Sequence, residues 1–514
     1  MYPDEFWTSF YQRKVNIQVK VTFISSMLFG FIAHMFMLTN KLPNYDDIHC
    51  LLDDYGAGVE FGRWMLFILG NIMRHTVGNV SLPWLNGLIC VILVSLSAVI
   101  VVSILEIKSK LFCGLTGAIM ISFPALTGTL FFMYTAIYYC MAILLIALSV
   151  KCVKDSKLGY LFGMALIAAG VGIYQAYFAW AVSLFLLFLL SEGLNTETEG
   201  KNIFFLGLKC LTVLAGSLLV YVGCVYLFLP IKGGELAGYQ SLNQMGQINI
   251  KDIPVLIVRA YQNYLFLMKR NVSGLNATWV VRTIQIILNL TVLLLLVPVM
   301  RKKIKSQQIL SVIVILGIII LFPLAVNLIY VMSANSSVYS IMLYSVVSIY
   351  LLPIVVIERT VDGRQLSVLC SWIGGILLAI VVVCQCQFSN IQYLAMHMQF
   401  EQASSYFTTL VTQVKSLTGY RSTMKVALIG ENIHDSSFFY NSEFDEYGMG
   451  GRSNDLINIY SRDDFLRRYL GYQQEIIQNT DVWETLPEVV SMPSYPEDGS
   501  IKIIDGTIVI KVEK

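Results

Sequence analysis

The feature that most constrains this chain is a series of long apolar segments before residue 390. A helix needs about 20 apolar residues to cross the hydrocarbon core of a bilayer. Apolar residues make up 56% of the chain and charged residues only 13%, unlike an ordinary soluble domain. We therefore expect an α-helical polytopic membrane protein with about eleven transmembrane helices. The predicted crossings are 18–39, 84–105, 112–130, 133–150, 158–173, 174–191, 203–230, 275–300, 307–332, 338–357 and 366–388.

The stretch 158–191 admits two interpretations, one overlong helix or two short ones. Gly170, Gly172 and the polar pair Tyr174-Gln175 lie in its middle and favour a break there. The choice matters because it changes the side on which every later loop lies.

Lysine and arginine residues in the short loops predict the orientation, since these residues concentrate on the cytoplasmic side. With eleven crossings, all the basic clusters lie on one side and the N-terminus, an amphipathic segment over 1–17, is cytoplasmic. The outside loops 40–83 and 231–274 and the tail 389–514 then lie on the periplasmic face. A single helix over 158–191 would put the last two clusters outside. The clusters are Arg13-Lys14-Lys20, Lys108-Lys110, Lys151-Lys154-Lys157, Arg301-Lys302-Lys303-Lys305 and Arg359-Arg364.

The tail differs from the membrane region in composition. From residue 390 onward the chain has 17 of its 33 acidic residues and 10 of its 35 basic ones. A helix is expected over 391–417, a buried strand over 424–430 and a helix near 462–479. Asp505-Gly506 between two β-branched runs predicts a hairpin. The tail is thus predicted to be a small water-soluble α/β domain.

The first outside loop, 40–83, is unusually rich in ionisable residues. A glycosyl transfer needs a carboxylate to take the acceptor's proton and a cation to stabilise the departing phosphate. Asp46 or Asp47 could be that base, and Arg63 could bind the phosphate together with Lys269, Arg270 or Arg282. The structural alternatives are a turn in which the aspartates bond their own backbone, and basic residues that only anchor a helix to anionic lipid.

A second group of polar residues is predicted to contact sugar. Asn44, Asp53 and Asp54 lie in the first outside loop, and Tyr174 and Gln175 lie at the break between two crossings. Tyrosines at helix ends also form the aromatic belts of ordinary membrane proteins, so a purely structural role stays open. A separate helix over 253–268 is expected to lie along the membrane surface.

Three short motifs resemble a known family. Asn44-Tyr-Asp46-Asp47, Gly62-Arg63-Trp64 and Gly172-Ile-Tyr174-Gln175-Ala-Tyr177 are similar to the serotype-converting O-antigen glucosyltransferases of phages and enterobacteria. The resemblance implies a GT-C glycosyltransferase of the bacterial inner membrane over 18–388. It also implies an undecaprenyl-phosphate-linked glucose donor, an O-antigen or other lipid-linked glycan acceptor, and reaction on the periplasmic face. The acidic motif of the family falls on Asp46 and Asp47, and its Gly-Arg pair on Gly62 and Arg63.

The resemblance implies no required cofactor and no metal ligands, because the departing phosphate already carries its charge. The four aspartates of the first loop leave a divalent cation open. The net charge of +2 gives no indication of nucleic-acid binding. Competing hypotheses are a flippase for lipid-linked oligosaccharide, an O-antigen polymerase and a membrane receptor. A flippase predicts charged groups at mid-membrane, and no acidic residue before 390 lies inside a predicted crossing.

Overall fold

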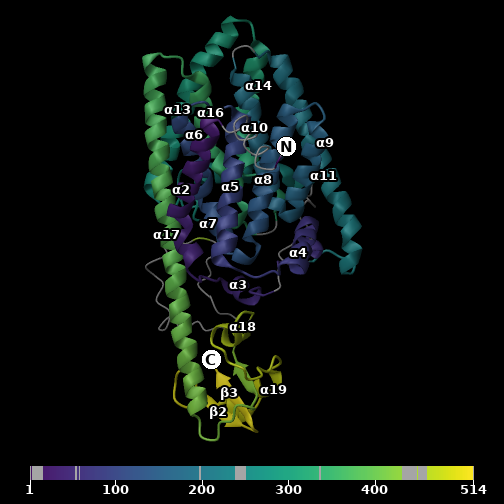
Figure 1. The fold of residues 1–514 in the computed structure, drawn as a ribbon, viewed down its shortest axis with the longest axis vertical. Helices are drawn as coiled ribbons and strands as arrows, with labels where there is room; N and C mark the ends of the chain where they lie inside the picture. Colours follow the sequence, from purple (N-terminus) through teal and green to yellow (C-terminus); the bar gives the residue numbers. More distant parts are fainter. Residues whose placement is uncertain are drawn as a thin grey trace.

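The protein is a bundle of long helices with a small sheet-containing domain beyond one end (Figure 1). The computed structural model describes residues 2, 16–52, 55–56, 58–195, 198–237, 250–334, 337–430, 449 and 460–512. The three-stranded sheet lies entirely in the C-terminal tail. The class predicted from the sequence, a polytopic helical protein with a small α/β tail, is confirmed.

Eight of the described helices are long and apolar enough to cross a membrane. They are α2 (Ile17–Thr39), α5 (Pro83–Leu105), α8 (Met133–Asp155), α10 (Phe178–Leu194, counted from Gln175), α11 (Gly200–Phe228, counted to Ile231), α13 (Trp279–Lys305), α14 (Ile309–Val326) and α17 (Gln365–Ser416). A pair bent by 41°, α6 (Lys110–Ser122) and α7 (Pro124–Leu130), makes a ninth if it is one span. The other two predicted crossings coincide with α9 (Gly159–Ile173) and α16 (Ser348–Thr360), which are shorter than a bilayer crossing. Eleven crossings therefore stays a prediction.

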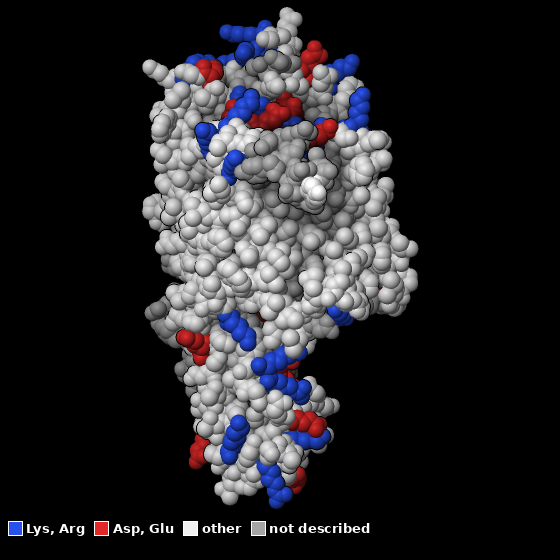
Figure 2. All heavy atoms as spheres, in the orientation of Figure 1, with Lys and Arg blue, Asp and Glu red and all other residues white. Residues whose placement is uncertain are grey.

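The outside of the bundle is apolar as well as its inside. Leu219, Leu227, Ile313 and Val383 are all at least 60% exposed. Figure 2 shows the resulting band without charge between two charged ends of the molecule. Such a large exposed apolar surface is suited to lipid rather than water.

The helices run between two ends of the bundle. At one end Glu106 pairs with Lys154 at 2.8 Å and with Arg359 at 2.9 Å, and Glu192 lies 3.5 Å from Lys154. These residues join the ends of α5, α8, α10 and α16, and we call this the Glu106 end. Asp47 and the start of α5 lie at the opposite end, the Asp47 end, because α5 is 23 residues or about 34 Å long.

The break predicted within 158–191 is present. α9 ends at Ile173 and α10 begins at Phe178, with a short 3-10 helix, Gln175–Tyr177, between them. α9 begins at Gly159, soon after α8 ends at the Glu106 end. Glu192, near the end of α10, lies at the same end, because it is 3.5 Å from Lys154. Since the break itself contacts Phe61 at the Asp47 end, α9 and α10 are two separate passages through the bundle.

Three shorter helices lie outside the long ones. They are α3 (Tyr45–His49) and α4 (Trp64–Thr76) in the first predicted outside loop, and α12 (Ile253–Phe266) in the second. In Figure 1, α3 lies between the bundle and the tail, and α4 lies beside the same end of the bundle. The helix predicted over 253–268 is present as α12, and its position along a membrane surface stays a prediction.

The tail domain is connected to the bundle by α17, whose 52 residues extend about 78 Å, beyond the end of the bundle. Its sheet has the order β1 (Val426–Ile429), β3 (Thr507–Lys511), β2 (Ile501–Ile504), with β1 parallel and β2 antiparallel to β3. The β2–β3 turn is Asp505-Gly506, both with positive φ, as the hairpin prediction requires. The helix predicted over 462–479 is wrong in length. It stops at Tyr469 because residues 475–477 run alongside β1 and bond to Val426.

Candidate functional site

α3 carries the acidic motif and begins at a side-chain cap. Asn44 Oδ1 accepts a hydrogen bond from Asp47 N at 2.8 Å, so the residue predicted to contact sugar is also the N-cap of α3. Its amide Nδ2 is buried and has no hydrogen-bond partner within the described structure. One half of this side chain is therefore used by the fold, and the other half is available to a ligand.

The Asp47 carboxylate holds α3 against the first turn of α8. Oδ1 accepts from Tyr134 N at 2.9 Å and from Ser81 Oγ at 3.1 Å, and Oδ2 accepts from Met133 N at 3.1 Å. The positive end of the α8 dipole favours a carboxylate at this place. Asp47 is only 2% exposed, and its burial raises its pKa to about 7 although the three hydrogen bonds oppose the shift. Both oxygens are thus engaged by the scaffold.

We expect Asp47→Asn to change the pH dependence of stability. A carboxyl whose pKa rises on folding contributes stability that is present below about pH 4 and lost as the pH approaches 7. The difference in unfolding free energy between wild type and Asp47→Asn should therefore narrow between pH 4 and 7, by an amount on the order of 4 kcal/mol. Thermal unfolding in detergent at a series of pH values measures it. If the difference in unfolding free energy between the two proteins widened toward pH 7, the pKa of Asp47 in the folded protein would be lowered rather than raised.

Arg63 lies among tyrosines rather than acids. Its guanidinium donates to Tyr139 OH at 3.1 Å and lies 4.9 Å from the centre of the Tyr174 ring, which stacks on Tyr139. Its Nε is buried without a hydrogen-bond partner, and no carboxylate of the described residues lies within 4.0 Å of it. Burying part of a cation without an anion is costly, and an anionic ligand would offset that cost.

Gln175 joins two of the sequence motifs. Its Nε2 donates to Phe61 O at 2.6 Å and to Tyr221 OH at 3.2 Å. Gly62 lies against Gln175 and Tyr221 and has φ +72°. A Cβ at this position would lie 2.6 Å from Tyr221 OH, so only glycine fits. The Gly62-Arg63-Trp64 and Tyr174-Gln175 motifs, 110 residues apart, therefore form one structural unit.

Gly172 allows this unit to pack against α4. A Cβ at this position would lie 2.5 Å from Trp64 Nε1, and the Trp64 ring is itself stacked on Phe228. We expect Gly172→Ala to destabilise the protein by about 1–3 kcal/mol through overpacking, seen as a lower melting temperature. Gly223→Ala is the matched control, because nothing lies within 4 Å of its new Cβ. Equal effects of the two changes would exclude the packing explanation.

Tyr134 connects the acidic helix with the arginine. Its backbone binds Asp47, and its side chain interacts electrostatically with Asp46 and Asp47 on one side and with Arg63 on the other. Asp46 is partly exposed, whereas Asp47 is buried. Asp46, Tyr134, Tyr139, Arg63 and Tyr174 are consequently parts of one site at the Asp47 end.

The other predicted residues lie elsewhere or use their side chains differently. Arg270 stacks on Phe266 at 3.9 Å, and Arg282 donates to the carbonyls of Asn276 and Ala277. Within the described residues, no interaction joins them or Lys269 to Asp47 or Arg63. Asp53 and Asp54 lie outside the described residues. Among the residues that the structure describes, no three His, Cys, Asp or Glu side chains gather as metal ligands would.

Two participants were missed by the sequence analysis. Ser81 binds Asp47, and Tyr221 of α11 binds Gln175. Neither has a local signal, because a serine before a membrane helix and a tyrosine within one are common. Only the folding of distant segments shows their part in the site.

An apolar helical bundle with carboxylates and a buried arginine at one end has the groups that a group-transfer enzyme at a membrane would need. A model of the family described as Glucosyl transferase GtrII matches residues 35–350. The match spans more than half of the chain, so the chain belongs to this glucosyltransferase family. It includes Asp46, Asp47, Arg63, Tyr174 and Gln175 and leaves the tail outside. Comparison with curated proteins and with solved structures gave no match.

Proposed function

We propose that the protein moves a glucosyl group from a polyprenyl-phosphate donor, such as undecaprenyl-phosphate glucose, to an O-antigen or other lipid-linked glycan on the periplasmic face of the inner membrane. The family match supports the glucosyltransferase class. The donor, the acceptor and the side of the membrane are the parts that we add.

One observation carries the donor assignment. Arg63 has a buried Nε and no carboxylate partner among the described residues, and it interacts with Tyr134, whose backbone binds Asp47 of the acidic helix. A polyprenyl phosphate places its anionic group at the membrane surface, with its chain in the lipid. A guanidinium can hold the phosphate oxygens by charge-assisted hydrogen bonds.

The arrangement supports a displacement at the sugar. Asp46 takes the proton from an acceptor hydroxyl, the hydroxyl oxygen bonds to C1 of glucose, and the bond between C1 and the phosphate oxygen breaks. The polyprenyl phosphate leaves with the bonding electrons, and Arg63 stabilises its charge. Asp46 is proposed as the base because it is the more exposed of the two, whereas Asp47 is buried and binds Ser81 and the start of α8.

The orientation follows from the two ends of the bundle. The Glu106 end carries Lys154 and Arg359, members of the clusters expected in the cytoplasm. The Asp47 end and the tail then face the periplasm.

Transfer by the purified protein tests the function. Protein in lipid nanodiscs, supplied with undecaprenyl-phosphate glucose and O-antigen-bearing lipid, should add single hexoses that mass spectrometry detects. An altered O-antigen chain length would instead indicate a polymerase. Movement of lipid-linked saccharide across a vesicle membrane without any new bond would indicate a flippase.

A further inference from the structure

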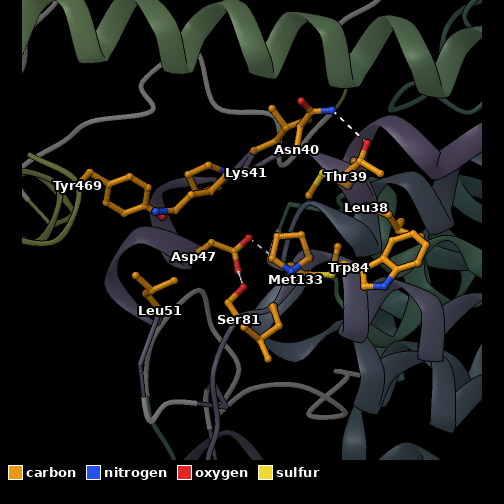
Figure 3. A pocket seen from close by; sticks show the side chains of 15 residues that line it. Leu38, Thr39, Asn40, Lys41, Asp47, Leu51, Ser81, Trp84, Met133 and Tyr469 are labelled. Carbon is orange, nitrogen blue, oxygen red and sulfur yellow. Dashed lines mark hydrogen bonds between the residues drawn. The ribbon is translucent and has the colours of Figure 1, made fainter.

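A second compartment lies beside α3 and has Asp47 in its lining. It is a cavity of about 380 Å³, within the size range of ligand sites (Figure 3). Asp47 and Met133 line it, whereas Asp46, Arg63, Tyr139 and Tyr174 do not. The cavity and the group around Arg63 therefore have different linings, although both include residues from α3 and the start of α8.

The tail domain supplies one wall of this cavity. Tyr469 lines it and faces Lys41, whose Nζ lies 3.8 Å from the centre of the tyrosine ring. Figure 3 shows these two side chains on the side of the cavity opposite Trp84. The wall comes from a part of the chain that the family match does not cover.

Several contacts fix the tail to α3. Arg468 donates to the carbonyls of Ile48 and His49, which are at the C-terminal end of α3, at 3.0 and 2.7 Å. His49 Nδ1 lies 2.8 Å from Asp464 Oδ2, and Ile48 belongs to the hydrophobic core of the tail. The domain is therefore packed onto the helix that carries the two aspartates.

The lining of the cavity suits an amphiphile with an anionic head. Most of the lining is apolar, and Leu82 and Trp84 at its edge are 46% and 49% exposed at the start of a membrane helix. Lys41 has no carboxylate within 4.0 Å among the described residues. An apolar wall open toward lipid, two aromatic rings and one cation match a lipid-linked saccharide with a phosphate group.

We propose that this cavity holds the acceptor, with the lipid-linked phosphate at Lys41 and the saccharide between Trp84 and Tyr469. The inference rests on the proposed function. It assigns the tail domain a direct part in acceptor binding, whereas Arg63, which binds the donor phosphate in the proposed function, is not in the lining of the cavity. Asp47 lines the cavity, and the proposed base, Asp46, directly precedes it on α3.

Separate kinetic constants for the two substrates test the assignment. Trp84→Ala, Lys41→Ala and Tyr469→Ala should each raise the KM for acceptor at least about tenfold and leave the KM for donor within about twofold. Tyr469→Phe keeps the ring and should behave as wild type. Trp279→Ala is the matched control, since Trp279 is 70% exposed at the start of another membrane helix. An unchanged acceptor KM in all three variants, or a rise in donor KM instead, would overturn the proposal.

A binding measurement keeps the test independent of turnover. A photoreactive amino acid at Leu51, which lines the cavity, should crosslink to undecaprenyl diphosphate N-acetylglucosamine and lose the crosslink in Tyr469→Ala. The same group at Tyr221, near Arg63, should crosslink to undecaprenyl-phosphate glucose instead. Crosslinking of both lipids at Tyr221 alone would refute a separate acceptor cavity. Binding of acceptor at Leu51 without any glucose transfer would refute the proposed function but not the cavity.

Discussion

Asp46→Asn should reduce glucose transfer about 10²–10⁴-fold, chiefly in kcat. The asparagine side chain has nearly the same shape but cannot take a proton from the acceptor hydroxyl. Because Asp46 is partly exposed and does not cap α8, the melting temperature should hardly change. Initial rates with undecaprenyl-phosphate glucose, together with thermal unfolding of the same preparation, measure both effects.

Two further variants make this result specific. Asp155→Asn removes an exposed aspartate at the Glu106 end and should leave the rate unchanged. Asp47→Asn should instead lower stability, since its carboxylate binds Ser81 and the start of α8. If Asp46→Asn kept full activity and Asp47→Asn lost it without unfolding, the roles of the two residues would be reversed.

Arg63→Ala should lower kcat/KM about 10²–10³-fold, with the loss expressed in the use of the donor. The variant removes the cation that stabilises the leaving phosphate. The stacked pair Tyr139 and Tyr174 then has no guanidinium beside it. Arg63→Lys should recover only part of the rate, because an ammonium cannot bind two phosphate oxygens as a guanidinium does. Rates over a range of donor concentrations measure the change.

Arg364→Ala is the control for charge removal. Arg364 is exposed beside Asp362 at the other end of the bundle, and its loss should have no effect on transfer. If Arg63→Ala changed only the KM for acceptor, the donor phosphate would have to bind at a residue other than Arg63. Lys269 or Arg270 would then be the next residues to test.

Much of the fold could be predicted because its signals are local. Most of the predicted crossings are single helices, Gly170 to Gln175 marked a real break, and Asp505-Gly506 formed the predicted turn. The segment 112–130 is instead the bent pair α6 and α7, and 338–357 is two short 3-10 helices followed by the start of α16. The shorter segments were harder to predict from the sequence. Length and hydropathy do not show whether α9 and α16 cross a bilayer, and the helix near 462 ended early because its continuation bonds to β1.

The candidate site was also predicted only in part from the sequence. The residue types of the loop 40–83 indicated carboxylate and guanidinium chemistry, yet they could not rank Asp46 against Asp47. The ranking came from the α8 backbone, whose first N–H groups occupy both oxygens of Asp47. Likewise, nothing in the sequence near Tyr469 relates it to Lys41, which lies more than 400 residues earlier.

The sequence by itself determined that this protein is an apolar helical bundle with an acidic loop at one end and a small α/β tail, since helix length and hydropathy are properties of consecutive residues. Only the tertiary structure decided which aspartate is an anchor, that Arg63 has a buried Nε without a hydrogen-bond partner among the described residues, and that the tail packs on α3. Those properties depend on hydrogen bonds and burial between segments far apart in the chain.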